Sequence, residues 1–159
     1  MPAAFAASVI AEAVQLSSAL PAPPTMSPAS MRTAGILLIT VPTVTIGGAS
    51  LLSFIGRRTP GYLDNPVRRG LWRAGHAHAG VLVMFALLAM LYVDQADLSD
   101  GLRTLVRVLF VAAPILMPLG FFLSVVRPAD TRPNKLIWLT GLGGVSLAAA
   151  ALTLGVGLV

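Results

Sequence analysis

The sequence predicts an all-α integral membrane protein, a bundle of four membrane-spanning helices that follows a short amino-terminal extension. Of the 159 residues, 56% are hydrophobic and only 11% are charged, whereas charged residues make up about a quarter of an ordinary soluble domain. Four apolar runs are each long enough to cross a bilayer core, which takes about 20 residues. They cover approximately residues 33–55, 72–93, 102–126 and 136–158.

Residues 1–30 form the predicted extension, and residues 31–159 form the transmembrane domain. Within residues 1–20, apolar side chains recur three and four apart, which is typical of a short surface helix. A secretory signal, or a translation start at Met26 or Met31, is the alternative interpretation. The segment 21–30 contains four prolines and is expected to be an extended linker.

Prolines and small residues shape the predicted spans. We expect Pro42 to kink the first span, with neighbouring threonine hydroxyls bonding the carbonyl that it frees. The pair Gly47–Gly48 and the small residues of the fourth span predict close helix packing. Arg107, about one turn inside the third span, either reaches the lipid headgroups or pairs with an aspartate of the preceding loop. These aspartates are Asp94, Asp97 and Asp100.

The distribution of cations predicts the orientation. Short loops rich in Lys and Arg stay in the cytoplasm, so the loops 56–72 and 127–135 should be cytoplasmic, with both termini outside the cell inner (plasma) membrane. These two loops, together with Arg73 directly after the first, hold eight of the eleven Lys and Arg residues. The eight are Arg57, Arg58, Arg68, Arg69, Arg73, Arg127, Arg132 and Lys135.

The second span carries the only two histidines of the chain, His76 and His78. Residues two apart on a regular helix point about 200° from one another, so these imidazoles cannot chelate one metal ion from an undistorted helix. Gly75 and Gly80 flank the pair and leave room for a local irregularity. Gly80, one turn after His76, favours His76 as the histidine that faces the bundle.

Three interpretations of the pair stay open. One histidine could bond a neighbouring helix while the other lies among the headgroups. A histidine could instead be an axial haem ligand or part of a transition-metal site, or it could carry protons. With two histidines, no cysteine and no carboxylate within a span, a zinc site with three histidines or thiolates is excluded. For a haem held by His and Met, Met117 of the third span is the candidate second ligand, with Met84 and Met90 as alternatives.

The string from Gly75 to Gly80, GHAHAG, resembles the histidine motif of membrane proteins related to the haem–copper oxidase catalytic subunit and of NnrS-type haem–copper membrane proteins. The resemblance implies that His76 and His78 bind haem or copper. The layout of the whole chain also resembles small four-helix membrane proteins of high-GC bacteria, which implies the fold and no particular activity.

Several function classes find no support in the sequence. No nucleophile with a base, phosphate-binding loop or calcium loop is present, so we do not expect an enzyme of soluble substrates. Anionic lipid headgroups, rather than nucleic acid, explain the net charge of +5. The resulting hypothesis is a small accessory subunit of a membrane redox complex that binds haem, a metal or a quinone, in contact with a larger complex or further copies of itself. The alternatives are a small transporter and a purely structural subunit.

Overall fold

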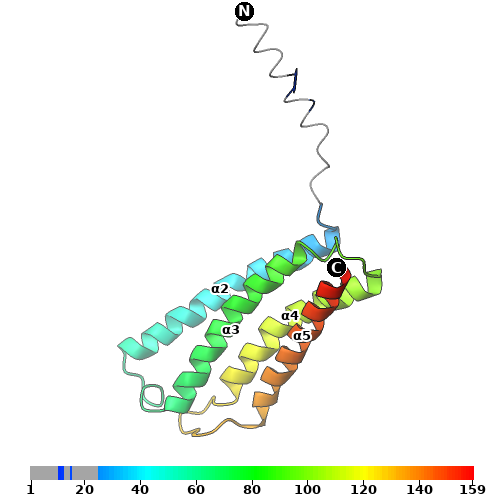
Figure 1. Ribbon diagram of the computed structural model, residues 1–159. Helices are drawn as coiled ribbons and strands as arrows, with labels where there is room; N and C mark the ends of the chain where they lie inside the picture. The colour runs from blue at the N-terminus through cyan, green and yellow to red at the C-terminus, as the bar shows by residue number, and fades with distance from the viewer. Residues whose placement is uncertain (1–10, 13–14, 16–24) are drawn as a thin grey trace, which may run out of the picture.

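The computed structural model describes residues 11–12, 15 and 25–159. The described residues form an all-helical bundle (Figure 1), which confirms the predicted fold class. Each of the four long helices is long and apolar enough to cross a membrane. They are α2 (Pro28–Gly56), α3 (Pro66–Met90), α4 (Asp100–Leu123) and α5 (Trp138–Leu158), and the 3₁₀ helix η1 (Lys135–Ile137) precedes α5.

Helix α2, which corresponds to the first predicted span, starts earlier than predicted. Ser27 caps it, since its side chain accepts a hydrogen bond from the Ser30 N–H at 3.2 Å, and Pro28 occupies its first turn. Serine at the cap followed by proline is a strong helix start, so the prediction of an extended linker up to Ser30 is wrong for its last three residues. The predicted surface helix over residues 1–20 lies outside the described residues apart from Ala11, Glu12 and Gln15.

Helix α3, which corresponds to the second predicted span, also starts earlier, at Pro66 rather than at residue 72. The Asn65 side chain accepts a hydrogen bond from the Arg68 N–H at 3.0 Å, and Pro66 follows in the first turn. An Asn-Pro pair begins a helix when the asparagine caps it. The last seven residues of the predicted loop 56–72 therefore belong to α3.

Pro42 lies inside α2, which continues on both sides of it. The proline has no N–H for the carbonyl of Leu38, four residues earlier. The prediction that a threonine hydroxyl bonds this carbonyl is wrong. A hydroxyl in a helix reaches the carbonyl three or four residues before it, and positions 41 and 42 are Val and Pro. The neighbouring threonines bond other carbonyls: Thr40 donates to Leu37, Thr43 to Thr40 and Thr45 to Val41, at 2.6, 2.6 and 3.3 Å.

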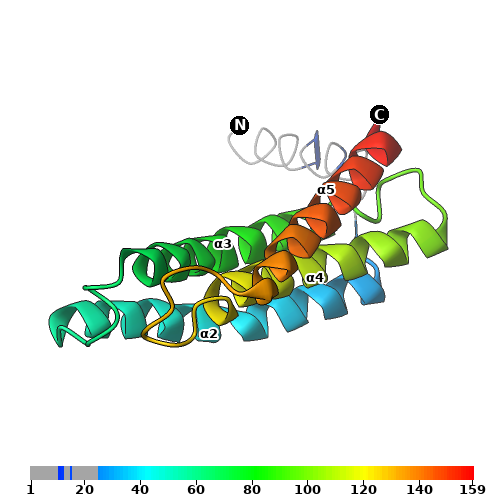
Figure 2. The same cartoon turned by 90° about the horizontal axis from the view of Figure 1, so that it is seen from below.

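The helices lie side by side in chain order (Figure 1), and within the described part of the chain α2 and α5 do not contact one another. Seen from below, α5 crosses α4 obliquely, whereas α2 lies along α3 and α4 (Figure 2). The core is centred on α3 and α4 and includes fully buried Met90, Val106 and Phe110. The bundle is therefore an open row whose outer helices are α2 and α5.

One end of the bundle is held together by a partly buried ion pair. Arg107 Nη2 donates to Asp94 Oδ1 at 2.6 Å, and the Ser27 N–H donates to Asp94 Oδ2 at 2.8 Å. Arg107 Nε donates to the Ser30 hydroxyl at 3.0 Å. Of the two alternatives predicted for Arg107, the structure shows the pairing with an aspartate. Burial alone would raise the pKa of Asp94, but hydrogen bonds from the Ser27 backbone, the two serine hydroxyls and Arg107 outweigh burial and lower that pKa.

The opposite end is joined by hydrogen bonds to backbone carbonyls. Buried Arg68 donates to the carbonyls of Gly61, Val125 and Val126 at 3.0, 3.2 and 3.1 Å. The Asn65 amide donates to the carbonyls of Pro128 and Asp130 at 3.0 and 2.8 Å. The accepting carbonyls lie in the first loop and in the segment that follows α4, outside the regular helices. These bonds place the first and third loops at the same end, as the hairpin arrangement predicts.

Candidate ligand-binding site

The His76 ring lies against the two adjacent glycines of α2. A Cβ atom at Gly48 would lie 2.9 Å from His76 Nε2, and one at Gly47 would lie 3.6 Å from Nδ1. Only glycine gives the imidazole room at position 48, since a real Cβ does not approach a side chain so closely. The predicted close-packing face at Gly47–Gly48 is therefore confirmed, and it receives an imidazole rather than another backbone.

Beside this contact, His76 lines a cavity of about 320 Å³ between α2, α3 and α4, which we call the His76 cavity. Pro114 and Pro118, one turn apart on α4, form part of its wall. The size is in the range of small-molecule sites. Its lining residues are Ile36, Leu37, Thr40, Thr43, Val44, Gly47, His76, Ala79, Val83, Val111, Pro114, Ile115, Pro118, Leu119 and Phe122.

The walls of the His76 cavity are almost entirely apolar. His76 is the one ionisable residue among them, and within the described part of the chain its ring makes no hydrogen bond. Thr40 and Thr43 also line the cavity, but their hydroxyls donate to backbone carbonyls of α2. The imidazole is therefore the polar group in the cavity whose hydrogen-bonding capacity is unused and available to a ligand.

His78 lies on a different face of α3. Its Nδ1 is 2.7 Å from the carbonyl oxygen of Ala74, and its ring centroid is 5.2 Å from that of Phe121 on α4. The helix is continuous through both histidines, so the pair keeps the angular separation expected from the spacing. His76 and His78 face different neighbours, and the structure does not bring them together.

The structure also separates His76 from Met117. Backbone and Cβ atoms of Met117 lie against Gly143 of α5, and its Cε methyl lies near Gly144. Met117 is not among the residues that line the His76 cavity. Of the alternative sulfur ligands, Met84 is 67% exposed on the outer surface and Met90 is buried in the core. No cluster of three or more His, Asp or Glu side chains suited to a metal ion occurs among the described residues.

The residues of α4 that complete the cavity were not predicted as site residues. Val111, Ile115 and Leu119 look like ordinary apolar residues of a membrane span, and nothing in their types marks them. The available signal was the pair Pro114 and Pro118. Prolines one turn apart remove two N–H groups from the helix, which favours an irregular face where space can remain.

The fold and these surfaces define a class of protein, a multi-pass four-helix membrane protein with a largely apolar cavity between three of its helices. Comparisons with protein-family models, with curated proteins and with solved structures found no match.

Proposed function

We propose that the protein binds an uncharged hydrophobic molecule with a carbonyl or hydroxyl group, of the quinone class, in the His76 cavity. The observation that carries the proposal is the unbonded imidazole in an otherwise apolar cavity of about 320 Å³. Ligand sites typically combine apolar walls with a few polar groups that fix orientation. A quinone ring matches such walls, and its carbonyl accepts a hydrogen bond from His76.

The same geometry favours a quinone over haem or a metal ion. A haem with two protein ligands needs a second residue opposite His76, and the candidates face elsewhere. His78 packs against Phe121, and Met117 packs against α5. A metal ion needs several ligands, whereas the cavity offers one imidazole. A quinone needs one donor to be oriented.

The redox chemistry of such a ligand would require a partner. An imidazole donates a hydrogen bond or a proton but supplies no electrons, so we propose that the protein holds the quinone for a larger membrane complex. The outer helix α2 offers the surface for such a complex. Only 11% of its most apolar stretch is buried against the rest of the chain. Affinity purification in mild detergent tests this step, and a discrete monomer that retrieves no redox subunit would count against it.

The binding test uses the two histidines as a matched pair. Trp72 is a natural reporter, because its ring centroid lies 6.0 Å from that of Phe122 in the cavity wall. Detergent-purified protein with Trp138→Phe, which leaves one tryptophan, is titrated with decylubiquinone while fluorescence quenching is measured. His76→Leu should weaken binding about tenfold, the value of one lost hydrogen bond of about 1.4 kcal/mol. His78→Leu should leave binding unchanged.

Two results would contradict the proposal. Equal quenching in both variants would show that the histidine at position 76 does not contact the quinone. A Soret band or stoichiometric metal that His76→Leu removes would instead support the haem or metal hypothesis. Absorption spectra of oxidised and reduced protein, with elemental analysis, distinguish these cases.

A transport function is the second candidate, and the shape of the cavity favours it. Pro114 and Pro118 form its wall and His76 faces it, so the cavity has the elements of a proline-shaped substrate site with one ionisable group. This hypothesis requires that His76→Gln impair uptake or efflux. Unchanged transport of every substrate that the wild-type protein moves would remove it.

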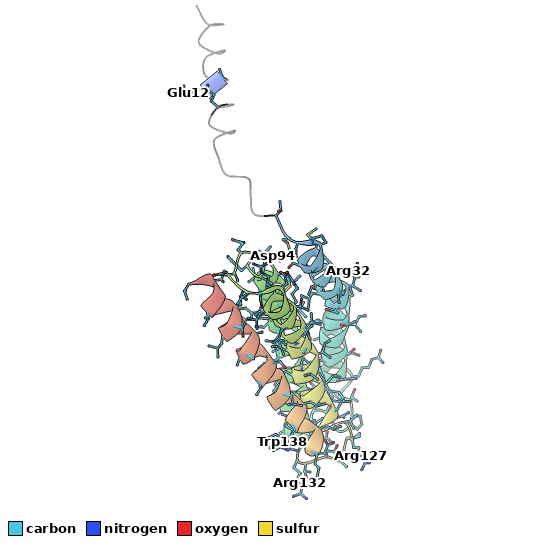
Figure 3. The ribbon with its side chains drawn as sticks, turned by 90° about the vertical axis from the view of Figure 1, so that its right-hand side faces the viewer. Glu12, Arg32, Asp94, Arg127, Arg132 and Trp138 are labelled. Carbon is cyan, nitrogen blue, oxygen red and sulfur yellow. The ribbon has the colours of Figure 1, made fainter. Side chains whose placement is uncertain are left out.

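We propose that both termini face outward, with the first and third loops in the cytoplasm. Figure 3 shows Asp94 at one end of the bundle and Arg127 and Arg132 at the other, and cation-rich short loops favour the cytoplasmic side. The chain has no cysteine, so single introduced cysteines report their side without background. In intact cells, a membrane-impermeant maleimide should label Gln95→Cys and leave Thr131→Cys unlabelled. The reverse pattern would invert the orientation.

A further inference from the structure

A second hollow lies on the outer side of the α2–α3 contact and shares only His76 with the His76 cavity. We call it the Arg73 groove. It has a volume of about 570 Å³ and lies between the last turns of α2 and the first turns of α3. Small residues on α3 keep that side of it open. Its lining residues are Leu51, Leu52, Ile55, Tyr62, Gly70, Arg73, Ala74, His76 and Ala77.

The groove holds two polar side chains whose hydrogen-bonding groups are unused. Arg73 is exposed, and within the described part of the chain its guanidinium makes no hydrogen bond or ion pair. Its neighbours differ: Arg68 and Arg69 both donate to backbone carbonyls. The Tyr62 side chain is 0% exposed, and its buried hydroxyl has no hydrogen-bond partner. Of these two groups, the exposed guanidinium of Arg73 is the one that a ligand in the groove can reach.

Apart from Arg73, Tyr62 and His76, the groove is apolar, and it reaches the outer surface of the bundle. Leu52 and Ile55 are 70% and 47% exposed along its α2 side. The groove also lies at the cation-rich end of the bundle. A cationic group beside an apolar rim, at the end of a membrane-spanning helix pair, matches a molecule with an anionic head and a hydrocarbon tail.

We propose that the Arg73 groove binds the headgroup of an anionic phospholipid. The guanidinium of Arg73 pairs with the phosphate, and the glycerol lies against the inner wall of the groove. An acyl chain then lies along Leu52 and Ile55. Basic pockets between membrane helices on the cytoplasmic side are suited to anionic headgroups, and the proposed orientation places the groove in that leaflet. Arg73 does not line the His76 cavity, so a loss of lipid binding in an Arg73 variant can be distinguished from a loss of quinone binding.

The test is a lipid titration of the detergent-solubilised full chain. The melting temperature is followed by intrinsic fluorescence as phosphatidylglycerol or phosphatidylcholine is added, because a ligand of the folded state raises it. Phosphatidylglycerol should stabilise the wild-type protein at lower concentration than phosphatidylcholine does. Arg73→Gln should weaken the apparent affinity for phosphatidylglycerol about fivefold, the effect of one arginine near an anionic surface.

Two further variants make the test specific. Arg132→Gln removes the same charge from an exposed position in the third loop and should retain the wild-type affinity. Tyr62→Phe should fold normally, because its hydroxyl bonds nothing in the protein, and should retain the wild-type affinity, because that hydroxyl is not accessible from the groove. Equal losses in Arg73→Gln and Arg132→Gln would overturn the proposal in favour of general charge attraction. Equal stabilisation by the two lipids, or by inorganic phosphate alone, would also overturn it.

Discussion

The α4–α5 pair and the α2–α3 pair both meet through glycines, but the glycines do different things. Gly143 of α5 lies against the backbone of Met117, where an added Cβ would be 2.7 Å from the Met117 nitrogen. Gly120 of α4 similarly receives the backbone of Thr140. On the other side of the bundle, Gly48 of α2 receives the imidazole of His76.

The difference explains where space remains in the molecule. When two backbones meet at a glycine, the helices approach as closely as helices can, and small side chains fill the seam. When a glycine receives a side chain, that side chain holds the helices apart beside the contact. The His76 cavity lies there, and Thr40, Val83 and Pro118 are among its walls. The α4–α5 seam is therefore closely packed, whereas the α2–α3 contact leaves a cavity that α4 completes.

The largest expected effect is on the α4–α5 seam. Gly120→Ala places a methyl group on the Thr140 backbone, which cannot move without separating the helices, so we expect a loss of about 3 kcal/mol, the upper range for overpacking. Gly155→Ala, at a position of α5 with nothing within 4 Å, should be neutral or up to about 1 kcal/mol stabilising. Unfolding of both variants in mixed micelles measures the difference, and equal stabilities would contradict the close backbone contact.

A somewhat smaller loss is expected where α2 is attached to its neighbours. Asp94→Asn removes the carboxylate that binds Arg107 and the Ser27 N–H, and we expect a loss of about 1.5–3 kcal/mol, as for hydrogen bonds to charged groups. Asp100→Asn is the matched control. Its ion pair with Arg103 is at the surface, with Asp100 98% exposed, so its loss should stay below about 1 kcal/mol. The same unfolding assay compares them.

The same carboxylate predicts an acid dependence. The pKa of Asp94 is below its ordinary value of 3.8, so the folded state binds the proton less tightly than the unfolded state does. The stabilisation is complete above that ordinary value and is lost as the pH falls through the lowered folded-state pKa. The melting temperature of the wild-type protein should therefore fall below about pH 4 more steeply than that of Asp94→Asn. Parallel curves for the two proteins would show that another group is responsible.

The smallest expected effect on stability is at the α2–α3 contact, where binding should change instead. Gly48→Ala puts a methyl group against the imidazole, which can rotate away, so the stability should change by less than about 1 kcal/mol. Decylubiquinone binding should weaken about as much as in His76→Leu, because His76 no longer holds its position. Gly35→Ala, in the same helix with nothing within 4 Å, should bind normally. A Gly48→Ala variant with wild-type affinity for decylubiquinone would show that the glycine contact is not needed for binding.

Hydropathy and helix-capping patterns account for most of the fold. The four spans were predicted, while the starts of α2 and α3 were placed too late, because Ser27 and Asn65 act as caps ahead of prolines. The candidate site was predictable in part. His76 was identified because an ionisable residue inside an apolar span is conspicuous, whereas the apolar residues that form the cavity around it carry no such signal.

What the sequence by itself determined is the set of segments that cross the bilayer and the end at which the cations collect. Both follow from the composition of single segments, because a bilayer core demands about 20 consecutive apolar residues whatever their neighbours are. Only the tertiary structure decided how each helix is rotated about its own axis. An apolar helix in lipid has no polar face to set that rotation, so contacts with neighbours set it. These contacts turn His76 toward α2, Met117 toward α5 and the prolines of α4 toward the cavity.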